Sequence, residues 1–265
     1  MYSASQLAKK YISFYLKASS RKGHGIHSPF VFDFIKHIKN DKSDYEAYKP
    51  IEEIRKQLLK NKSIIPVQDF GAGSAVIKSK DRFVYKIAQS SLKSKRFARL
   101  FFRIIKKFEP PIIIELGTSF GITTAYMAAA GPQSKIYSLE GAPAIAAIAK
   151  MNFEKLHLQN IGLIAGDFKD SLPKLLAQLP SFDFAFIDGN HRKAPTLDYF
   201  KRFKEKRNDN SLLIFDDIHW SNEMEEAWQS IQQDAEVTLT IDLFYVGIVF
   251  FKKEFKVKQH FSLRF

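Results

Sequence analysis

Hydrophobic positions follow two different patterns along the chain, and the change falls near residue 110. Before it, apolar residues recur at helical spacing in segments separated by polar or glycine-containing stretches. We predict helices there over 6–18, 30–38, 51–59 and 86–107. After it, short continuous apolar runs alternate with segments long enough for helices. We predict strands over 112–116, 136–139, 161–165, 182–187 and 212–215.

Continuous apolarity is typical of strands that are covered on both faces, and therefore of a parallel sheet between helices. Two later runs, 237–242 and 246–251, lie too close together for a crossover and predict an antiparallel hairpin. The predicted fold class is α/β, with a doubly wound, mostly parallel seven-stranded sheet and a C-terminal antiparallel hairpin. We expect two domains, a mainly helical N-terminal extension or lid over 1–109 and the sheet domain over 110–265.

Composition narrows the chemistry and the compartment. The 265 residues are 45% hydrophobic and include no cysteine, which excludes disulfides, thiolate nucleophiles, iron-sulfur clusters and cysteine zinc sites. A reducing compartment fits this composition, so we expect a cytoplasmic protein. No stretch stays apolar for the roughly 18 residues that a membrane span needs, and we expect neither a signal peptide nor a span.

The net charge of +13 is distributed unevenly. Residues 1–109 hold 24 Lys and Arg against 9 Asp and Glu, whereas residues 110–265 hold 17 against 19. Clustered cations are typical of surfaces that bind nucleic acid or anionic lipid. Many of the cations over 92–107 fall at helical spacing beside apolar residues, which favours a solvated helix face. Nucleic acid therefore stays an alternative partner.

Three strand ends carry residues suited to one cofactor. After the first strand comes a bend with two glycines four residues apart. These glycines let a ligand approach the backbone closely and leave helix N–H groups directed at an anion. The next strand ends in Glu140, whose carboxylate can accept hydrogen bonds from the ribose hydroxyls. The third strand ends at 166–168, which can offer a polar contact and an apolar face to adenine. Carboxylate, ribose and adenine in this order describe S-adenosylmethionine. The cofactor-binding candidates are Glu115, Gly117, Thr118, Ser119, Gly121, Thr123, Glu140, Gly141, Asp167, Phe168 and Asp188.

The run 115–124, together with Glu140, the sequence DGNH at 188–191 and the closing hairpin, resembles the class I S-adenosylmethionine-dependent methyltransferases, in particular the catechol O-methyltransferase branch. The resemblance covers about residues 110–251. It implies a Rossmann-like catalytic domain over 110–265 and O-methylation of a small hydroxylated acceptor. The stretches 23–30 and 69–74 resemble extensions of uncharacterised bacterial members.

The resemblance also implies a metal site and a base. The family places a metal-ligating aspartate where Asp188 stands, and an Asp-Asn pair where this chain has Asp216 and Asp217. Oxygen ligands suit Mg²⁺ or Ca²⁺, although Asp188 is also able to contact substrate or cofactor without an ion. His191 stands where the family has a basic lysine, so it is the candidate general base, with His219 as the second.

Other features have structural and functional interpretations that both stay open. The glycine loop at 69–74 imitates a cofactor loop but lacks a following strand with a terminal acid, so a turn is favoured. His24 and His27 suit a lid or a packing role. Arg192 and Lys193 suit steering of an anionic substrate or simple solvation. Trp220 and Trp228 are typical of a core or a pocket wall.

Two other functions stay open. One is methylation of nucleic acid or protein docked on the basic half, although no NPPY-type tetrapeptide follows the fourth strand. The other is a dinucleotide-dependent oxidoreductase or a non-catalytic nucleotide binder, against which the missing third glycine argues. The sequence leaves the choice between a monomer and a homodimer open.

Overall fold

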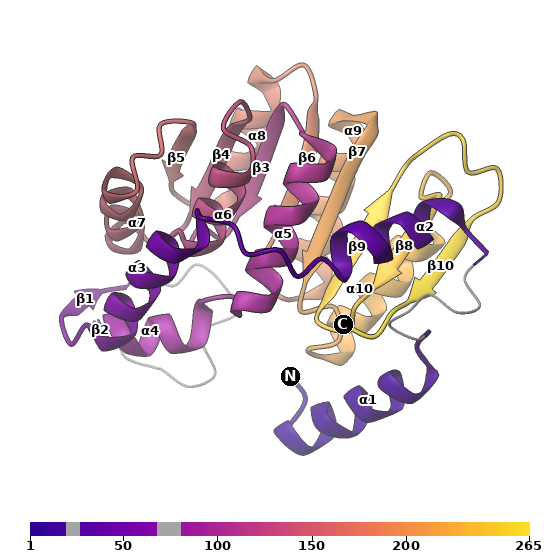
Figure 1. The fold of residues 1–265 in the computed structure, drawn as a ribbon, viewed down its shortest axis with the longest axis horizontal. Helices are drawn as coiled ribbons and strands as arrows, with labels where there is room; N and C mark the ends of the chain where they lie inside the picture. Colours follow the sequence, from indigo (N-terminus) through magenta and orange to yellow (C-terminus); the bar gives the residue numbers. More distant parts are fainter. Residues whose placement is uncertain (20–26, 68–80) are drawn as a thin grey trace. The chain divides into compact units, whose positions relative to one another are not determined.

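The computed structural model describes residues 1–19, 27–67 and 81–265, which form two compact units (Figure 1). One unit contains residues 42–180. The other joins residues 1–41 to residues 181–265. The expected division after residue 109 falls inside the first unit, and as a statement about independent domains it stays a prediction.

The unit 42–180 is built on three parallel strands in the order β3-β4-β5. Helices α6, α7 and α8 pack on β4, and α5 packs on α6. Its core joins the helices before the sheet to α6 and α7. The elements are α3 (Tyr48–Lys60), β1 (Ile64–Pro66), β2 (Asp81–Phe83), α4 (Val84–Ser91), α5 (Lys95–Phe108), β3 (Ile112–Leu116), α6 (Ile122–Ala130), β4 (Lys135–Glu140), α7 (Pro143–Lys155), β5 (Ile161–Ala165) and α8 (Phe168–Gln178).

The single helix predicted over 86–107 is wrong, because two helices, α4 and α5, occupy this segment. The chain is extended at Leu92, which ends α4, and again at Ser94, which precedes α5. The hydroxyl of Ser91 donates to the carbonyl of Ile87, a competing bond that serine often makes at helix ends. The apolar spacing continues across this break and conceals it. The short antiparallel pair β1 and β2 was also not expected.

The unit of residues 1–41 and 181–265 has the strand order β10-β8-β9-β7-β6. Strands β6 and β7 are parallel, whereas β9 runs antiparallel to both β7 and β8. Helix α9 packs on β6 and on α10. The elements are α1 (Ala4–Lys17), α2 (Pro29–Phe34), the π-helix η1 (Ile35–Lys39), β6 (Phe182–Ile187), α9 (Lys193–Lys206), β7 (Arg207–Asp216), α10 (Asn222–Gln233), β8 (Leu239–Asp242), β9 (Val246–Phe250) and β10 (Gln259–Ser262).

The predicted fold class is confirmed, with one correction. The strands form an eight-stranded mixed sheet that contains the expected parallel strands and the expected β8–β9 hairpin. The eighth strand is β10, which pairs in parallel with β8. Its short polar sequence alternates between partly buried and exposed positions, so it lacks the continuous apolar run on which the prediction of seven strands relied.

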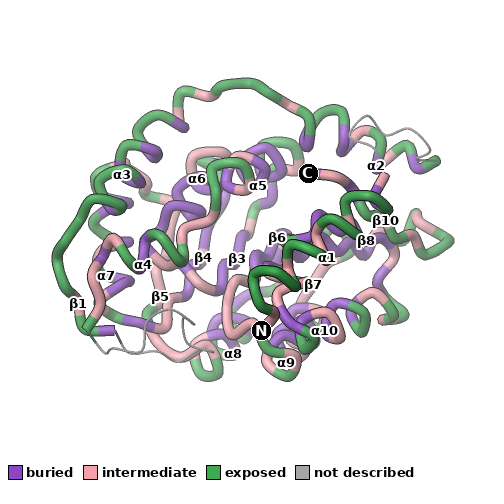
Figure 2. The backbone as a smooth tube through the Cα atoms, turned by 90° about the horizontal axis from the view of Figure 1, so that it is seen from below, coloured by how far each residue is buried: buried purple, intermediate pink, exposed green. Residues whose placement is uncertain are grey.

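Burial follows most of the predicted strands (Figure 2), but β5 lies at the edge of the sheet and its residues are half-buried or exposed. The C-terminal part of β7, residues 211–216, is buried throughout, as are β8 and β9. Phenylalanine fills much of this interior, with fully buried rings at 182, 184, 186, 203, 215 and 250. No helix in the described part of the chain is both long enough and apolar enough to cross a membrane.

Candidate functional site

The glycine bend between β3 and α6 adopts a backbone conformation that needs its glycines. Gly117 has φ 97° and Gly121 has φ 79°, both in the left-handed region that side chains disfavour. A Cβ atom on Gly121 would lie 2.4 Å from the Cε1 atom of Phe153 in α7. Ser119, between the glycines, also has a positive φ of 49°. Strained residues of this kind persist where the surrounding structure fixes them, often at functional sites.

Glu140 at the end of β4 is bonded directly to this bend. Its Oε2 atom accepts a hydrogen bond of 2.7 Å from the N–H of Ser119, and its Oε1 atom accepts one of 2.9 Å from the N–H of Ala142. The N–H of Gly117 donates to the carbonyl of Leu139 at 2.9 Å. The structure thus brings together the two motifs that the sequence assigned to one cofactor.

A chain of buried hydroxyl groups supports the bend from behind. The Oγ atom of Ser138 donates to Glu115 Oε2 at 2.6 Å, and Thr118 therefore donates to Ser138 across 2.5 Å. Thr124 also donates to Glu115. Glu115 is fully buried, so it holds the bend in place, and its predicted role as a cofactor-binding residue stays a prediction. The sequence reasoning missed Ser138, which is the only polar residue inside the apolar run 136–139.

The end of β5 offers space beside a glycine. Gly166 has φ 139°, and a Cβ atom placed on it would meet nothing within 4 Å. The Oδ1 atom of Asp167 accepts a hydrogen bond from the N–H of Lys169 at 2.9 Å and caps α8. Phe168 is the first residue of α8 and is half-buried. An apolar face beside open space fits the adenine contact expected here, whereas Asp167 already has a structural role.

The remaining candidates of the bend differ in burial. Thr123 on α6 is 8% exposed, and Gly141 after β4 is half-buried.

Ser91, at the end of α4, was not predicted as a site residue, but its hydroxyl lies 2.7 Å from that of Ser119. Because the Ser91 hydroxyl already donates to Ile87, it accepts the hydrogen bond from Ser119. No motif around Ser91 indicated this contact.

A second group of candidates lies at the ends of β6 and β7. One ligand atom each of Asp188, His191 and Asp216 lie within 4.8 Å of one another. His191 Nε2 is 3.4 Å from Asp188 Oδ1, and His191 Nδ1 is 3.9 Å from Asp217 Oδ2. Asp216 is almost completely buried, whereas the other three are half-buried. Asp217, with φ 53°, and Asn190, with φ 60°, add local backbone strain.

His219, the second candidate base, belongs to a separate network. Its Nδ1 atom lies 3.1 Å from Glu225 Oε1 and its Nε2 atom 2.9 Å from Asp242 Oδ2. Burial opposes a charge on this imidazole, but the carboxylates of Asp242 and Glu225 outweigh it and raise the pKa of His219 above its ordinary value. Both ring nitrogens are thus engaged. Trp228, predicted to lie in the core or in a pocket wall, is buried over Gly247 and donates to Asp242 at 3.2 Å.

The charges that follow His191 are partly neutralised. Arg192 lies 3.4 Å from Glu223, and the Nζ atom of Lys193 lies 2.7 Å from Glu226, both on α10. The N–H of Lys193 also donates to Glu223 at 3.2 Å. These ion pairs favour a surface role for the two cations over steering of an anionic substrate.

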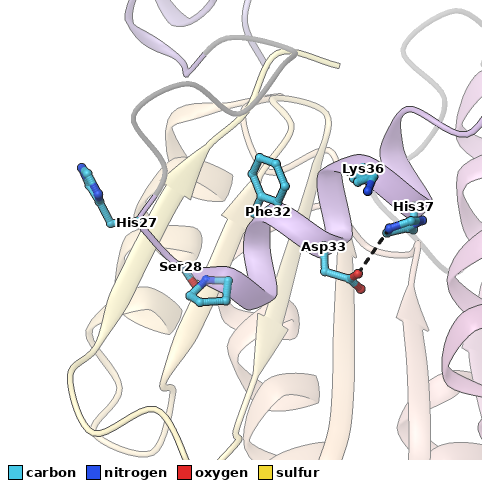
Figure 3. Close-up of a pocket in the computed structure, with 7 residues that line it drawn as sticks. His27, Ser28, Phe32, Asp33, Lys36 and His37 are labelled. Carbon is cyan, nitrogen blue, oxygen red and sulfur yellow. Dashed lines mark ion pairs between the residues drawn. The ribbon is translucent and has the colours of Figure 1, made fainter.

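A cavity of about 390 Å³ lies along α2 and η1 (Figure 3). It is lined by His27, Ser28, Pro29, Phe32, Asp33, Lys36 and His37. The ion pair of Asp33 and His37, 3.7 Å apart, spans one side of it. Of the predicted functional residues it contains only His27, as His24 and the glycine loop 69–74 lie outside the described residues. This cavity is therefore not the site indicated by the motifs.

Comparison with known proteins bears on both groups of residues. Residues 114–218 match the model of a methyltransferase domain. The match begins in β3 and ends just after Asp217, so it includes the glycine bend, Glu140 and the acidic cluster.

Catechol O-methyltransferases are among the curated relatives. That of Niastella koreensis is 32% identical over 109 residues, 40% of this chain and 48% of the relative. That of Mycobacterium tuberculosis is 32% identical over 80 residues, 29% and 36% of the two chains. This chain therefore matches less than half the length of either relative. The resemblance inferred from the sequence motifs is confirmed over this region.

Solved structures show the same fold over more of the chain. A Podospora anserina methyltransferase with bound SAH (S-adenosylhomocysteine) has a TM-score of 0.61 at 14% identity, covering 96% of this chain and 99% of that one. An O-methyltransferase from Bacillus cereus in complex with SAH has a TM-score of 0.57 at 16% identity, covering 79% and 92%. These likenesses extend the shared fold beyond the matched domain.

Proposed function

We propose that this chain is an S-adenosylmethionine-dependent O-methyltransferase that acts on a small hydroxylated acceptor. The observation that carries the proposal is the hydrogen bond of 2.7 Å between the N–H of Ser119 and the carboxylate of Glu140. It joins the glycine bend and the acidic strand end within the segment that matches a methyltransferase domain. The expected cofactor needs these two motifs at one place.

The cofactor-binding roles follow from the local geometry. The bend between Gly117 and Gly121, at the start of α6, receives the amino acid end of the cofactor, because N–H groups at a helix start favour a carboxylate. Glu140 accepts hydrogen bonds from the ribose hydroxyls, since each carboxylate oxygen can accept more than one hydrogen bond. The open space at Gly166, beside Phe168, takes the adenine.

His191 takes the proton from the acceptor hydroxyl. Its ring lies between the carboxylates of Asp188 and Asp217, which favour the charged imidazolium once the proton has arrived. The sulfonium methyl group is already activated, so the protein mainly has to align the acceptor oxygen with it and accept this proton.

Metal assistance is a finer part of the proposal. Asp188 and Asp216 each have a carboxylate oxygen within 4.8 Å of the other, and two negative charges at this distance repel each other unless a cation or a proton intervenes. Their oxygens therefore fit a divalent ion such as Mg²⁺. Such an ion would lower the pKa of a coordinated acceptor hydroxyl. A nitrogen lone pair that binds the ion cannot take the proton, so we assign the ion to the carboxylates and the proton to His191.

Calorimetric titration with S-adenosylhomocysteine tests the assignment. We expect wild type to bind and Glu140→Ala to bind at least tenfold more weakly, because the bonds to the ribose are lost. Glu154→Ala removes an equal charge from an exposed position on α7 in the same unit and is the matched control. Absence of binding by wild type, or equal affinities of wild type and Glu140→Ala, would contradict the proposal.

The alternatives from sequence lead to different measurements. A nucleic-acid substrate docked on residues 1–109 predicts polynucleotide binding that weakens steeply with salt. Several cations of this region are held in ion pairs, among them Lys10 with Glu225, Arg55 with Glu52 and Arg99 with Asp44, which makes a dedicated basic surface less favoured. A dinucleotide enzyme predicts NADH binding without a response to S-adenosylhomocysteine.

A further inference from the structure

Helix α1 presents apolar side chains on two opposite faces. On the inner face, the rings of Tyr11 and Phe14 pack against Phe244, with centroids 5.0 and 5.4 Å away. On the outer face, Ile12 is 59% exposed and Leu16 is 72% exposed. At about 100° per residue, this outer pair lies roughly 150° around the helix axis from the inner pair. Packing within the unit therefore explains the inner face and leaves the apolar outer face unexplained.

The apolar side chains of the outer face form a stripe along the helix. Ala8, Ile12 and Leu16 are spaced four residues apart, so their side chains follow one another on one face. Tyr15 lies beside them and is exposed, and the four residues are called the outer stripe below. No residue of α1 is buried, and most of the helix is exposed (Figure 2). Single exposed apolar residues are common on proteins, whereas a contiguous apolar patch is typical of a surface that binds a partner.

Positive charges accompany the outer stripe. Lys9 is seven residues before Leu16, which places it on the same face of the helix. Lys17 stands in the last turn, and the guanidinium of Arg264 lies 4.7 Å from the ring centroid of Tyr15. Lys9 and Lys17 are exposed, and within the described residues neither of them forms an ion pair. Both lysines can therefore meet a negatively charged partner.

Contacts at both ends hold α1 in place. Near its start, the hydroxyl of Tyr2 donates to Glu225 at 2.8 Å, and the N–H of Tyr2 donates to the carbonyl of Trp220 at 3.1 Å. Just past its end, the N–H of Ser19 donates to the carbonyl of Ser262 at 2.9 Å. An isolated helix of this length is marginal in water, whereas α1 is formed before any partner arrives. Binding through the outer stripe therefore costs little ordering of the chain.

The charge around the outer stripe selects the kind of partner. Residues 1–32 contain five Lys and Arg and no Asp or Glu. A second copy of this chain would bring like charges together, which opposes a symmetric contact through α1. Nucleic acid attracts cations, but its backbone is bound through charged and polar side chains and not through aliphatic ones. An anionic bilayer satisfies both features, because its headgroups attract lysine while apolar side chains enter its interface.

We propose that α1 is an interfacial helix that docks the protein on an anionic lipid bilayer. The outer stripe lies at the boundary between headgroups and acyl chains, and the helix lies parallel to the surface. Lys9 and Lys17 reach the lipid phosphates through their long side chains. This inference concerns where the protein binds, so it goes beyond the proposed function and does not depend on it.

Co-sedimentation of the full chain with lipid vesicles tests the proposal. Wild type should bind vesicles of equal parts phosphatidylglycerol and phosphatidylcholine, and should bind pure phosphatidylcholine vesicles at least about tenfold more weakly. The double variant Ile12→Gln, Leu16→Gln should bind the anionic vesicles about tenfold more weakly, because it loses the apolar side chains that enter the interface. Lys9→Gln and Lys17→Gln should each weaken this binding about fivefold, as expected for one charge near the surface.

Matched substitutions elsewhere separate this role from a general loss of apolar surface or charge. Ile64 and Met151 are 57% and 50% exposed, so the double variant Ile64→Gln, Met151→Gln removes similar apolar surface in the other unit. Lys60→Gln and Lys155→Gln remove exposed charges there. These control variants should bind the anionic vesicles within twofold of wild type. Glutamine forms helices about as well as leucine, so the α1 variants should keep the melting temperature of wild type.

The opposite results overturn the proposal. It fails if wild type does not bind the anionic vesicles, if wild type binds pure phosphatidylcholine equally well, or if the α1 and control variants lose equal amounts of binding. A double α1 variant that keeps vesicle binding but sediments as a smaller species without lipid would assign the outer stripe to a contact between two copies of the chain. A loss of polynucleotide binding in Lys9→Gln and Lys17→Gln, with vesicle binding unchanged, would assign the cations to nucleic acid.

Discussion

Replacing Gly121 with alanine combines backbone strain with a steric clash. At φ 79°, an alanine costs about 1–2 kcal/mol. The new Cβ atom would lie 2.4 Å from Cε1 and 2.6 Å from Cζ of Phe153, a ring that is 5% exposed and has little room to move. Overpacking of this kind costs a further 1–3 kcal/mol or so. Alanine also restricts the unfolded chain, which offsets about 0.4–1 kcal/mol.

We therefore expect Gly121→Ala to lower the free energy of unfolding by about 3 kcal/mol, measured by urea denaturation with the slope held common to all variants. Gly162→Ala in β5 is the matched control, because its Cβ atom would make an ordinary contact of 3.5 Å with Tyr137. We expect it to leave the free energy of unfolding unchanged or to raise it by up to about 1 kcal/mol, because alanine restricts the unfolded chain and meets no clash here.

A double variant separates the two contributions. Phe153→Leu removes the atoms that the new methyl group would meet, so Gly121→Ala should destabilise this background less than it destabilises wild type. Equal stabilities of Gly121→Ala and Gly162→Ala would refute the reasoning. Strict additivity of Gly121→Ala and Phe153→Leu would show that the clash contributes nothing.

Three further changes test other parts of the structure. Burial alone would raise the pKa of Glu52, but the charge of Arg55 outweighs burial and lowers this pKa. The Glu52 carboxylate therefore stabilises the folded chain above about pH 4.5, and this stabilisation is lost as the pH falls through the lowered pKa. Glu52→Gln should lower the free energy of unfolding by about 3 kcal/mol at pH 7 in urea denaturation, and its difference from wild type should shrink in acid. Glu225→Gln weakens the ion pair between Glu225 and Lys10 of α1 and should speed proteolysis near the N-terminus, whereas Lys9→Gln on the exposed side of that helix should not. Asp188→Asn should abolish any Mg²⁺ binding that calorimetry detects in wild type, and retained binding would place the ion elsewhere.

Much of the fold is local in origin and could be read from the pattern of apolar residues. The parallel strands and the closing hairpin were predicted because their runs are continuous and their connections have informative lengths. The break between α4 and α5 was not predicted, because serine side chains end α4 while the apolar spacing continues. Strand β10 was missed because each of its residues pairs with a residue of β8 that lies 20 positions earlier, and because it has no apolar run.

The candidate site also has a part that the sequence predicts and a part that it does not. The positions of Gly121 and Glu140 follow from motifs at strand ends, since parallel strands end at one edge of a sheet. The hydrogen-bond partners of the residues in the bend could not be predicted from the sequence. Ser91 is far from Ser119 in sequence, yet their hydroxyls meet at 2.7 Å.

The amino-acid sequence by itself determined the fold class, the glycine bend and the acids at the strand ends, because these depend on local spacing and on residue type. Only the tertiary structure decided which of the histidines lies in the acidic cluster. His191 and His219 are both near strand-end aspartates in sequence, but His219 is held by Asp242 and Glu225. Contacts between segments far apart in the chain depend on three-dimensional packing, and spacing along the sequence does not encode them.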